Sequence, residues 1–335
     1  MSAIVLSPSE VRRLLPMREC IELMAEVFKD LARGEAVNPL RSVVRLPKGL
    51  GLLGMMPGYM PSTGALGLKA IAVFPGNHGT EYDAHQGVVL LFDPEHGLPS
   101  AIVDASEITA IRTAAATAVA TMALAREDSE DLAILGSGVQ ARTHLEAMSI
   151  ARKIRRVRVY SPTRERRESF ARHEAERYGI DVEARSSARD AVDGADIICT
   201  TTTAKEPILQ GSWLAPGAHV NAVGSSIADA RELDTAAVVR SRLFVDRRES
   251  TVNEAGDFLF PKKEGAIDDD HIAGEIGEVL LGQRSGRESA DEVTLFKSLG
   301  LAVEDLAAAH YVLRRARAEG SGTTVDLGGY RHAAD

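Results

Sequence analysis

The chain has 335 residues, of which 44% are hydrophobic and 26% charged, and its formal net charge is −9. This composition is typical of a globular protein with room for two domains, and the acidic balance disfavours general nucleic-acid binding. No apolar run approaches the roughly 18 residues that a membrane helix needs, and the N-terminal residues lack the basic start of a signal peptide. The two cysteines, Cys20 and Cys199, cannot form a disulfide framework and fit a reducing compartment, so we expect a cytoplasmic protein.

The N-terminal part of the chain predicts helix followed by mostly antiparallel sheet. One helix is predicted over residues 7–34, because Ser7 and Glu10 have capping-box spacing and Gly34 suits a helix end. The strand-like segments between about residues 40 and 103 are SVVRLP, ALGLKAIAVF, GVVLLFD and SAIVD, with DPEHG as a hairpin turn between the last two. A second capping box, DASE at 104–107, opens a helix of small residues, ITAIRTAAATAVATMALA.

From about residue 130 the chain alternates between short apolar strands and helices. The strands are expected at LAILG, VRVYS, ADIICT, HVNAVG and RLFVD, and helices near 139–151, 163–178 and 187–194. Such alternation is typical of a doubly wound parallel sheet covered on both faces. The amphipathic segment VEDLAAAHYVLRRARAEG is predicted to pack back onto the first domain, and the Gly-rich end that follows is predicted to be exposed.

A glycine turn at 136–141, GSGVQA, follows the first of these strands and opens the next helix. Gly136 permits a tight turn, Gly138 lets the backbone approach a pyrophosphate, and Ala141 is small enough for the helix to pack on the strand. The free N–H groups of the helix N-terminus then favour an anion. A lone G-x-G is often only a tight turn, but the strand and helix around it predict dinucleotide binding. The residues expected to contact the cofactor here are Gly136, Ser137, Gly138, Val139 and Gln140.

The second strand of this region, VRVYSPTRERR, ends without the acid that usually binds the ribose 2′-hydroxyl. Ser161, Thr163 and Arg164 suit a 2′-phosphate better, because hydroxyls and a guanidinium bind phosphate oxygens. The alternative is a solvated helix start, since Ser161 and Thr163 are also good N-caps. We therefore favour NADP(H) over NAD(H), although backbone groups of 161–167 can still bind a diol.

Seven stretches, in chain order, resemble the ornithine cyclodeaminase/mu-crystallin family. They are MMPGYMPSTGALGLKAIAVFP (55–75), GVVLLFDPEHGLP (87–99), ITAIRTAAATAVAT (108–121), LGSGVQARTH (135–144), NAVGS (221–225), GEIGEVLLG (274–282) and FKSLGLAVEDLAAA (296–309). The resemblance implies a homodimer built through the sheet of the first domain and an active site in an interdomain cleft. There, hydride passes between nicotinamide C4 and the α-carbon of an amino acid or its imine.

The expected fold class is α/β. It combines a Rossmann dinucleotide-binding domain with a doubly wound parallel sheet over residues 116–304 and an α+β domain over 1–115 and 305–335. The resemblance implies that the α+β domain binds the substrate and forms the dimer.

Three basic residues, Arg45, Lys69 and Arg112, lie in apolar surroundings of the first domain. A lysine inside a largely apolar strand needs a partner, unless strand alternation turns it to solvent. Arginine binds a carboxylate with two parallel hydrogen bonds. The resemblance implies that Lys69 and Arg112, and less securely Arg45, bind the α-carboxylate of the substrate.

Proton transfer has two candidate donors, Lys69 and His85. His85 starts a strand, and its imidazole can donate at neutral pH, although a structural histidine is an equally good interpretation. The resemblance adds contacts to the cofactor from the segments that end or follow two of the strands, ADIICT and HVNAVG, and from the small-residue helix. These residues are Thr113, Thr201, Thr202, Val223, Gly224 and Ser226. His271 and His310 have no ligand-spaced partner, so no metal site is predicted.

Two departures from the family pattern narrow the activity. Ser226 stands where cyclodeaminases and archaeal alanine dehydrogenases carry an Asp, and Asp229 lies three residues further on. The stretch GLGLLGMMPGYM lacks the acid with which cyclodeaminases bind the distal amine, so a cationic side chain would lie there without a counter-charge. Both departures count against cyclodeamination, and the missing Asp favours the ketimine reductase-like branch, which also lacks it.

The leading hypothesis is an NAD(P)H-dependent reductase of a small α-imino acid. Its substrate would be a cyclic ketimine such as pyrroline-2-carboxylate or piperideine-2-carboxylate, or a linear imine such as iminosuccinate. The rivals are an alanine-type amino-acid dehydrogenase, an ornithine cyclodeaminase, and a non-catalytic protein that binds NADPH or another ligand. No nucleic-acid or membrane partner is expected.

Overall fold

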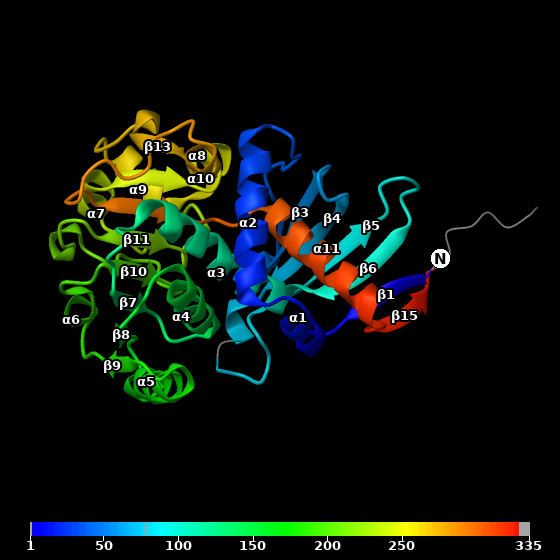
Figure 1. Ribbon diagram of the computed structural model, residues 1–335, viewed down its shortest axis with the longest axis horizontal. Helices are drawn as coiled ribbons and strands as arrows, with labels where there is room; N and C mark the ends of the chain where they lie inside the picture. The colour runs from blue at the N-terminus through cyan, green and yellow to red at the C-terminus, as the bar shows by residue number, and fades with distance from the viewer. Residues whose placement is uncertain (1, 78, 328–335) are drawn as a thin grey trace, which may run out of the picture. The chain divides into compact units, whose positions relative to one another are not determined.

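The computed structural model describes residues 2–77 and 79–327 (Figure 1). The chain divides into two compact units, one of Met1–Arg112 with Leu301–Asp335 and one of Thr113–Gly300. The assignment of substrate binding and dimerisation to one part and dinucleotide binding to the other stays a prediction at this point. In the described part of the chain, no helix is both long and apolar enough to cross a lipid bilayer.

The first unit is built on a seven-stranded sheet. Its strands, in spatial order, are β15 (Thr323–Asp326), β1 (Ser2–Leu6), β6 (Pro99–Asp104), β5 (His85–Phe92), β4 (Ala65–Val73), β3 (Leu52–Met60) and β2 (Ser42–Arg45). All neighbours are antiparallel except β1 and β6, which are parallel. The predicted mostly antiparallel sheet is therefore confirmed, including the hairpin between β5 and β6.

Three strands of this sheet were not predicted, and β3 shows why. Gly54, Pro57 and Gly58 interrupt the alternation of its side chains, yet Gly58 serves packing, because a Cβ there would lie 3.2 Å from Leu306 Cδ1. The prediction of an exposed C-terminal end is confirmed for most of β15, whose residues are exposed except for the partly buried Val325, although this segment pairs with β1. For residues 328–335 it lies outside the described residues.

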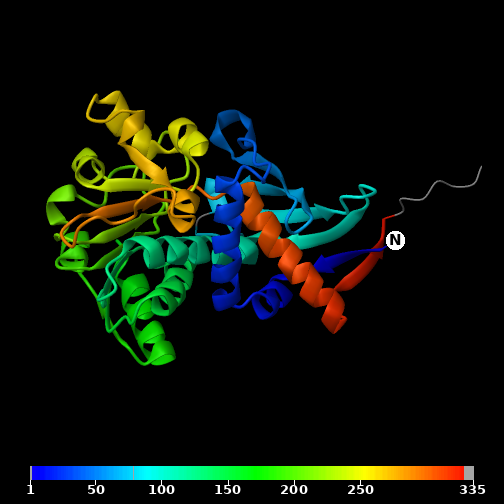
Figure 2. The same cartoon turned by 45° about the horizontal axis from the view of Figure 1, so that its top comes forward.

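Helices α2 and α11 belong to the same unit as this sheet. α1 (Pro8–Leu14) and α2 (Met17–Ala32) replace the single predicted helix, because Pro16 lacks an N–H and disfavours helical backbone at Leu15. α11 (Ala302–Glu319) contacts β3, β4, β5 and α2 and lies across the sheet in both views (Figures 1 and 2), as predicted for this amphipathic segment. The first unit also contains two short 3₁₀ turns, η1 (Pro47–Gly49) and η2 (Pro75–Asn77), and the start of α3 (Ala105–Leu124).

The second unit contains an eight-stranded sheet whose neighbouring strands are all parallel. The spatial order is β13 (Ile272–Glu275), β12 (Arg242–Val245), β14 (Thr294–Lys297), β11 (His219–Ala222), β10 (Ile197–Thr200), β7 (Asp131–Leu135), β8 (Arg156–Tyr160) and β9 (Asp181–Ala184). The chain leaves β7 towards β8 and β9 and returns to β10 on the other side. The carboxyl ends of β7 and β10 therefore form a topological switch point, where such sheets bind ligands.

The connecting helices cover this sheet. They are α4 (Val139–Ala151), α5 (Arg164–Tyr178), α6 (Ala188–Val192), α7 (Thr235–Arg240), α8 (Arg248–Glu254), α9 (Gly256–Lys263) and α10 (Ile276–Leu280), with the 3₁₀ turns η3 (Gly211–Trp213) and η4 (Asp269–His271). The strands β7, β10 and β11 are buried almost throughout. The α/β fold class and the doubly wound sheet are confirmed, whereas the short strands β9, β13 and β14 escaped the sequence analysis.

Candidate active site

A buried cluster of two cations and two acids lies in the first unit. Lys69, on β4, donates to Thr109 Oγ1 at 2.6 Å and to Asp305 Oδ1 at 3.1 Å. Arg112, on α3, donates from Nε to the same Asp305 oxygen at 2.9 Å and from Nη1 to Glu304 Oε2 at 2.8 Å. All four charged side chains are at most 5% exposed. The cluster therefore holds two positive and two negative groups away from water.

Burial sets the titration of this cluster. It lowers the pKa of Lys69 to about 8; Asp305 opposes that shift, while the positive charges of Arg112 and Arg41 add to it. Burial alone would raise the pKa of the Asp305 carboxyl, but Arg112 and Lys69 outweigh it and hold that pKa below its ordinary value. Asp305 Oδ2 is buried and has no hydrogen-bond partner among the described residues. A lysine with this pKa can gain or lose a proton near neutral pH.

The acids of the cluster were missed by the sequence analysis, although the sequence contains a signal for them. Glu304 and Asp305 lie in the first turn of α11, where the helix dipole favours negative side chains. Two buried cations also require counter-charges. Because Lys69 and Asp305 are 236 residues apart in the chain, only the packing of α11 on β4 identifies them as partners.

The register of the sheet relates the other predicted residues to Lys69. Arg45 pairs with Leu52, which pairs with Val73, which pairs with His85. Val73 and Lys69 are four residues apart on β4, and this even spacing puts the row on the same face of the sheet as Lys69. The row lies about 13 Å from Lys69 along the strand. Arg45 and His85 are both exposed, and their proposed roles are untested by this placement.

Arg41 is a basic residue that the sequence analysis did not single out. It precedes β2, and extending the β2–β3 register by one residue places it opposite Met56, the partner of Lys69. Two strand spacings, about 10 Å, then separate the Cα atoms of Arg41 and Lys69 on one face. The effect of Arg41 on the pKa of Lys69 agrees with this proximity.

The glycine turn of the second unit has the geometry of a βα phosphate turn. Gly136 has φ +123°, and a Cβ there would lie 2.6 Å from Thr201 Oγ1 and 2.8 Å from its carbonyl oxygen, so only glycine fits. Gly138 is the N-cap of α4, and among the described residues only its chain neighbours and the backbone of its own helix come within 4 Å of the place where its Cβ would be. This open space at a helix N-terminus fits a pyrophosphate.

The neighbours of the turn fit a dinucleotide as well. Val139 is 64% exposed at the start of α4, whereas Ala141 is fully buried against the sheet. The turn also contains Ser137 and Gln140. Thr113 is buried, and its hydroxyl has no hydrogen-bond partner among the described residues. A buried hydroxyl without a partner is the kind of group that a ligand satisfies.

The residues that follow β8 are those that could bind the adenosine ribose of a cofactor. Ser161 Oγ accepts a 2.9 Å hydrogen bond from Ser137 Oγ of the glycine turn. Thr163 is the N-cap of α5, and Arg164 is largely exposed and bound to Glu168 at 2.7 Å. Hydroxyls and an exposed guanidinium lie here without a carboxylate at the strand end, which fits a phosphate and also leaves backbone groups for a diol.

Two further loops lie at the carboxyl ends of β10 and β11. They contain Thr201 and Thr202 after β10, and Val223, Gly224 and Ser226 after β11. Glu232, a residue that no sequence motif identified, joins these loops, because its carboxylate accepts hydrogen bonds from both. Asp229 is exposed and Ser226 partly buried.

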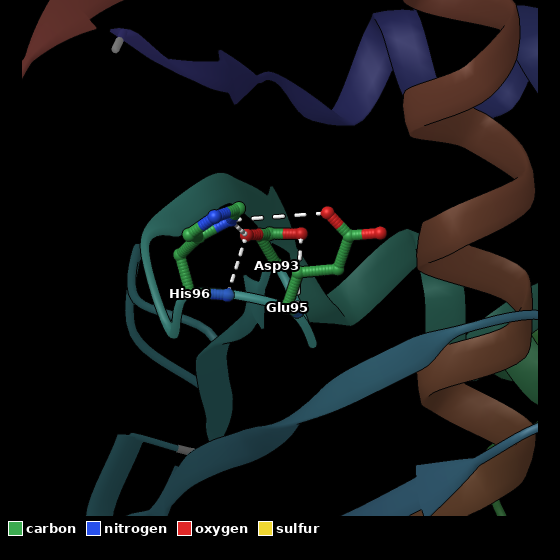
Figure 3. Close-up of side chains that lie close together, drawn as sticks. All are labelled: Asp93, Glu95 and His96. Carbon is green, nitrogen blue, oxygen red and sulfur yellow. Dashed lines mark hydrogen bonds and ion pairs between the residues drawn. The ribbon is translucent and has the colours of Figure 1, made fainter.

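The turn between β5 and β6 gathers Asp93, Glu95 and His96 at the surface (Figure 3). Asp93 accepts hydrogen bonds from the backbone and ring nitrogens of His96 at 2.9 and 3.0 Å, and Gly97 follows with φ +72°. These bonds are those of a hairpin turn. We therefore assign no metal to it.

Comparison with known proteins reveals full-length relatives. The sequence profile of the ornithine cyclodeaminase/mu-crystallin family matches residues 1–320. Ketimine reductase mu-crystallin of Mus musculus is 43% identical over 279 residues, which cover 83% of this chain and 85% of that protein. Delta(1)-pyrroline-2-carboxylate reductase of Bacillus cereus is 36% identical over 325 residues, which cover 97% of this chain and all of that protein.

A solved structure is similar over nearly the whole chain. It is Delta(1)-pyrroline-2-carboxylate reductase of Thermococcus litoralis in complex with NADH and L-proline. The match has a TM-score of 0.94 at 40% identity and covers 96% of this chain and all of the other.

Proposed function

Because the chain belongs to the ornithine cyclodeaminase/mu-crystallin family, we propose that it is an NAD(P)H-dependent reductase that converts a cyclic ketimine acid to the L-amino acid. The chain is an oxidoreductase that uses a nicotinamide cofactor. The substrates we favour are Δ1-pyrroline-2-carboxylate and its six-membered homologue, piperideine-2-carboxylate. The observation that carries the proposal is the buried pair Lys69 and Arg112.

We assign the substrate carboxylate to this pair together with Arg41. Lys69 and Arg112 are balanced by Glu304 and Asp305, so by themselves they offer little net charge to an anion. Arg41 adds a third cation near Lys69, and a guanidinium binds a carboxylate at two oxygens. Arg45, on the same face, remains the predicted alternative.

We assign the proton to Lys69. When bound, the nicotinamide supplies a hydride to the C=N carbon, so the nitrogen must receive one proton for the reaction to balance. Lys69, with its pKa lowered to about 8 by burial, is protonated at neutral pH and acidic enough to donate. His85 is the alternative donor.

We assign the cofactor to the second unit. The turn at 136–140 would hold the pyrophosphate, Thr113, Thr201 and Thr202 would contact the cofactor, and Val223, Gly224 and Ser226 would line the next loop. Ser161, Thr163 and Arg164 favour NADP(H) over NAD(H), because they can bind a 2′-phosphate and no acid is present to bind the diol.

The rival activities fit the site less well. A cyclodeaminase would need a free acid for the distal amine, whereas Glu304 and Asp305 are already bound to Arg112 and Lys69. A linear substrate such as iminosuccinate would need a cation for its second carboxylate, which Arg45 could provide. An alanine-type dehydrogenase needs the same carboxylate site, so only the substrate test separates it from the reductase.

We also propose a homodimer formed through the uncovered face of the seven-stranded sheet. The row Pro57, Leu68, Leu90 and Ile102 runs across four strands of this face, and these side chains are partly buried or exposed. Leu53, on the same face, is 40% exposed. A contiguous apolar face of this kind favours association.

We further propose a cytoplasmic location, since both cysteines are unpaired.

The deciding experiment follows absorbance at 340 nm with NADH or NADPH. The substrates are pyrroline-2-carboxylate, piperideine-2-carboxylate, iminosuccinate generated in place, and pyruvate with ammonia. We expect turnover on a cyclic ketimine, a loss of at least 100-fold in Lys69→Met, and wild-type rates in Lys153→Met, which removes an exposed lysine.

Other outcomes assign other functions. Fastest turnover with pyruvate and ammonia would replace the proposal with an amino-acid dehydrogenase. Formation of proline from ornithine without net cofactor consumption would indicate cyclodeamination. Cofactor binding without turnover on any substrate would support the non-catalytic interpretation.

A further inference from the structure

A single buried carboxylate joins the two loops that follow β10 and β11. Glu232 is fully buried. Its Oε1 accepts hydrogen bonds from the backbone N–H and the hydroxyl of Thr202, both at 2.7 Å. Its Oε2 accepts from Thr200 Oγ1 and from the backbone N–H of Gly224, again both at 2.7 Å. Each carboxylate oxygen therefore holds one backbone N–H, and the two N–H groups belong to different loops.

Two more buried charges support this carboxylate. Asp257 Oδ1 accepts hydrogen bonds from the backbone N–H groups of Glu232 and Leu233, at 2.8 and 3.0 Å. Lys297, in the stretch FKSLG, donates to Asp257 Oδ2 at 2.8 Å and to the carbonyl oxygen of Ser225. Lys297 and Asp257 are at most 3% exposed. The network thus connects the ends of β10, β11 and β14.

Gly224 shows how closely the two loops approach. A Cβ at this position would collide with the backbone of Thr202 and with the Glu232 carboxylate. The glycine therefore lets one loop lie directly against the other. Glu232 accepts the N–H of Thr202, and it shares the N–H of Gly224 with the carbonyl oxygen of Thr200. Burial and the charge of Asp257 raise the pKa of Glu232, while Lys297 and the two threonines oppose them. Two backbone donors face the carboxylate, as suits an ionised acceptor.

The position of the network gives it a function. The strands of this sheet are parallel, so the loops after β10 and β11 lie at the same edge as the glycine turn after β7, where dinucleotides bind. Glu232, Asp257 and Lys297 are too deeply buried to contact a ligand, but Thr201, Thr202 and Gly224 are among the residues assigned to the cofactor. A site of this kind depends on supporting residues that hold the contact residues in place.

We propose that Glu232, supported by Asp257 and Lys297, is a positioning residue for the nicotinamide cofactor, because it fixes the loops 200–202 and 223–225 relative to each other. This inference rests on the proposed function only in requiring that the chain bind a nicotinamide dinucleotide.

Glu232→Gln tests the inference with little change in shape. An amide has one accepting oxygen, so whichever way it turns, its NH₂ group faces the N–H of Thr202 or of Gly224. We expect at least a tenfold rise in the Kd for NADH or NADPH, measured by fluorescence of the bound dinucleotide. In the cofactor-free protein, amide hydrogen exchange at Thr202 or Gly224 should accelerate at least tenfold, a readout independent of activity.

The matched control is Asp196→Asn, at the opposite end of the same sheet. Asp196 Oδ2 also accepts two backbone N–H groups, those of Glu130 and Asp131, both at 3.0 Å. We expect this variant to lower the melting temperature but to leave the Kd within twofold of wild type. An equal loss of affinity in both variants, or a Glu232→Gln protein with wild-type affinity, would overturn the positioning role.

Thr200→Val decides the matter if Glu232→Gln does not fold. It removes one buried donor to the carboxylate without touching the residues assigned to the cofactor, and we expect about a threefold rise in the Kd. An unchanged Kd in this variant would overturn the inference. Wild-type protein that binds neither dinucleotide would instead overturn the proposed function, and the positioning role with it.

Discussion

Lys69 and Arg112 lie on different elements, yet both donate to Oδ1 of Asp305. The residue types of the two cations could be predicted as functional, because a basic residue in apolar surroundings is unusual. Their counter-charges could not, since Glu304 and Asp305 look like ordinary first-turn acids of a helix. The interpretation of Arg45 depended on its residue type and on the family resemblance, whereas the register of the sheet puts Arg41 in the row of Lys69.

The pH dependence of the reaction should report on Lys69. The protonated form is the one that attracts the carboxylate and donates the proton. Because its pKa is lowered to about 8 by burial, the protonated fraction decreases as the pH rises through 8. We expect kcat/KM for the ketimine to decrease on the alkaline side of about pH 8 in the wild-type protein.

Lys69→Arg is the control for this profile, since arginine stays charged over the whole range. We expect a lower kcat, because a guanidinium is a poor acid, and no decrease in kcat/KM between pH 8 and 10. The substrate itself gains and loses protons in the same way in assays of both proteins. The difference between the two pH profiles therefore isolates the titration of Lys69. An identical alkaline decrease in both would exclude Lys69 as its source.

At the scale of elements, helices and strands whose limits are set by neighbouring residues in the chain could be predicted from the sequence. The helix at 139–151 was predicted with the bounds that α4 has, because a glycine turn and a buried strand define its start. The single helix over 7–34 was wrong, because capping signals at both ends concealed the break at Pro16. β3 escaped prediction because Gly54, Pro57 and Gly58 interrupt its alternation; Gly58 lies against Leu306 and Ala302 of α11.

A substitution in the turn between β7 and α4 can change the affinity for the dinucleotide without changing the stability of the fold. Gly138→Ala adds a methyl group where no atom of another described segment of the chain lies within 4 Å, so we expect an unchanged melting temperature. The same methyl would occupy the space assigned to the pyrophosphate, and the Kd for NADPH should rise at least tenfold. Titration of dinucleotide fluorescence and a thermal melt measure the two quantities.

Gly136→Ala is the contrasting variant in this turn. Its φ of +123° and the nearness of Thr201 forbid a side chain, so both the melting temperature and the affinity should decrease. If Gly138→Ala bound the dinucleotide as tightly as wild type, the assignment of the pyrophosphate to this turn would be wrong.

At the scale of the whole molecule, the apolar face of the seven-stranded sheet is the feature that calls for a second copy of the chain. Leu68→Lys places a charge in the middle of that face, and burying an unpaired lysine in an interface is costly. We expect the wild-type protein to be a dimer and this variant a monomer in light scattering coupled to size-exclusion chromatography. Val239→Lys, at a 47% exposed apolar position of the other unit, should remain dimeric. A monomeric wild type, or a dimeric Leu68→Lys, would contradict the proposed interface.

The sequence by itself determined the α/β class, the glycine turn with its helix, the candidate residues Lys69 and Arg112, and the family of the chain. These follow from periodicity, turn chemistry and motifs, which depend on neighbours in the chain. Only the tertiary structure decided the partners of Lys69 and Arg112, the row that contains Arg41, and the connection of two loops through Glu232. The reason is that a buried charge or N–H group is satisfied by whatever packing brings near, and for Lys69 that partner lies 236 residues away.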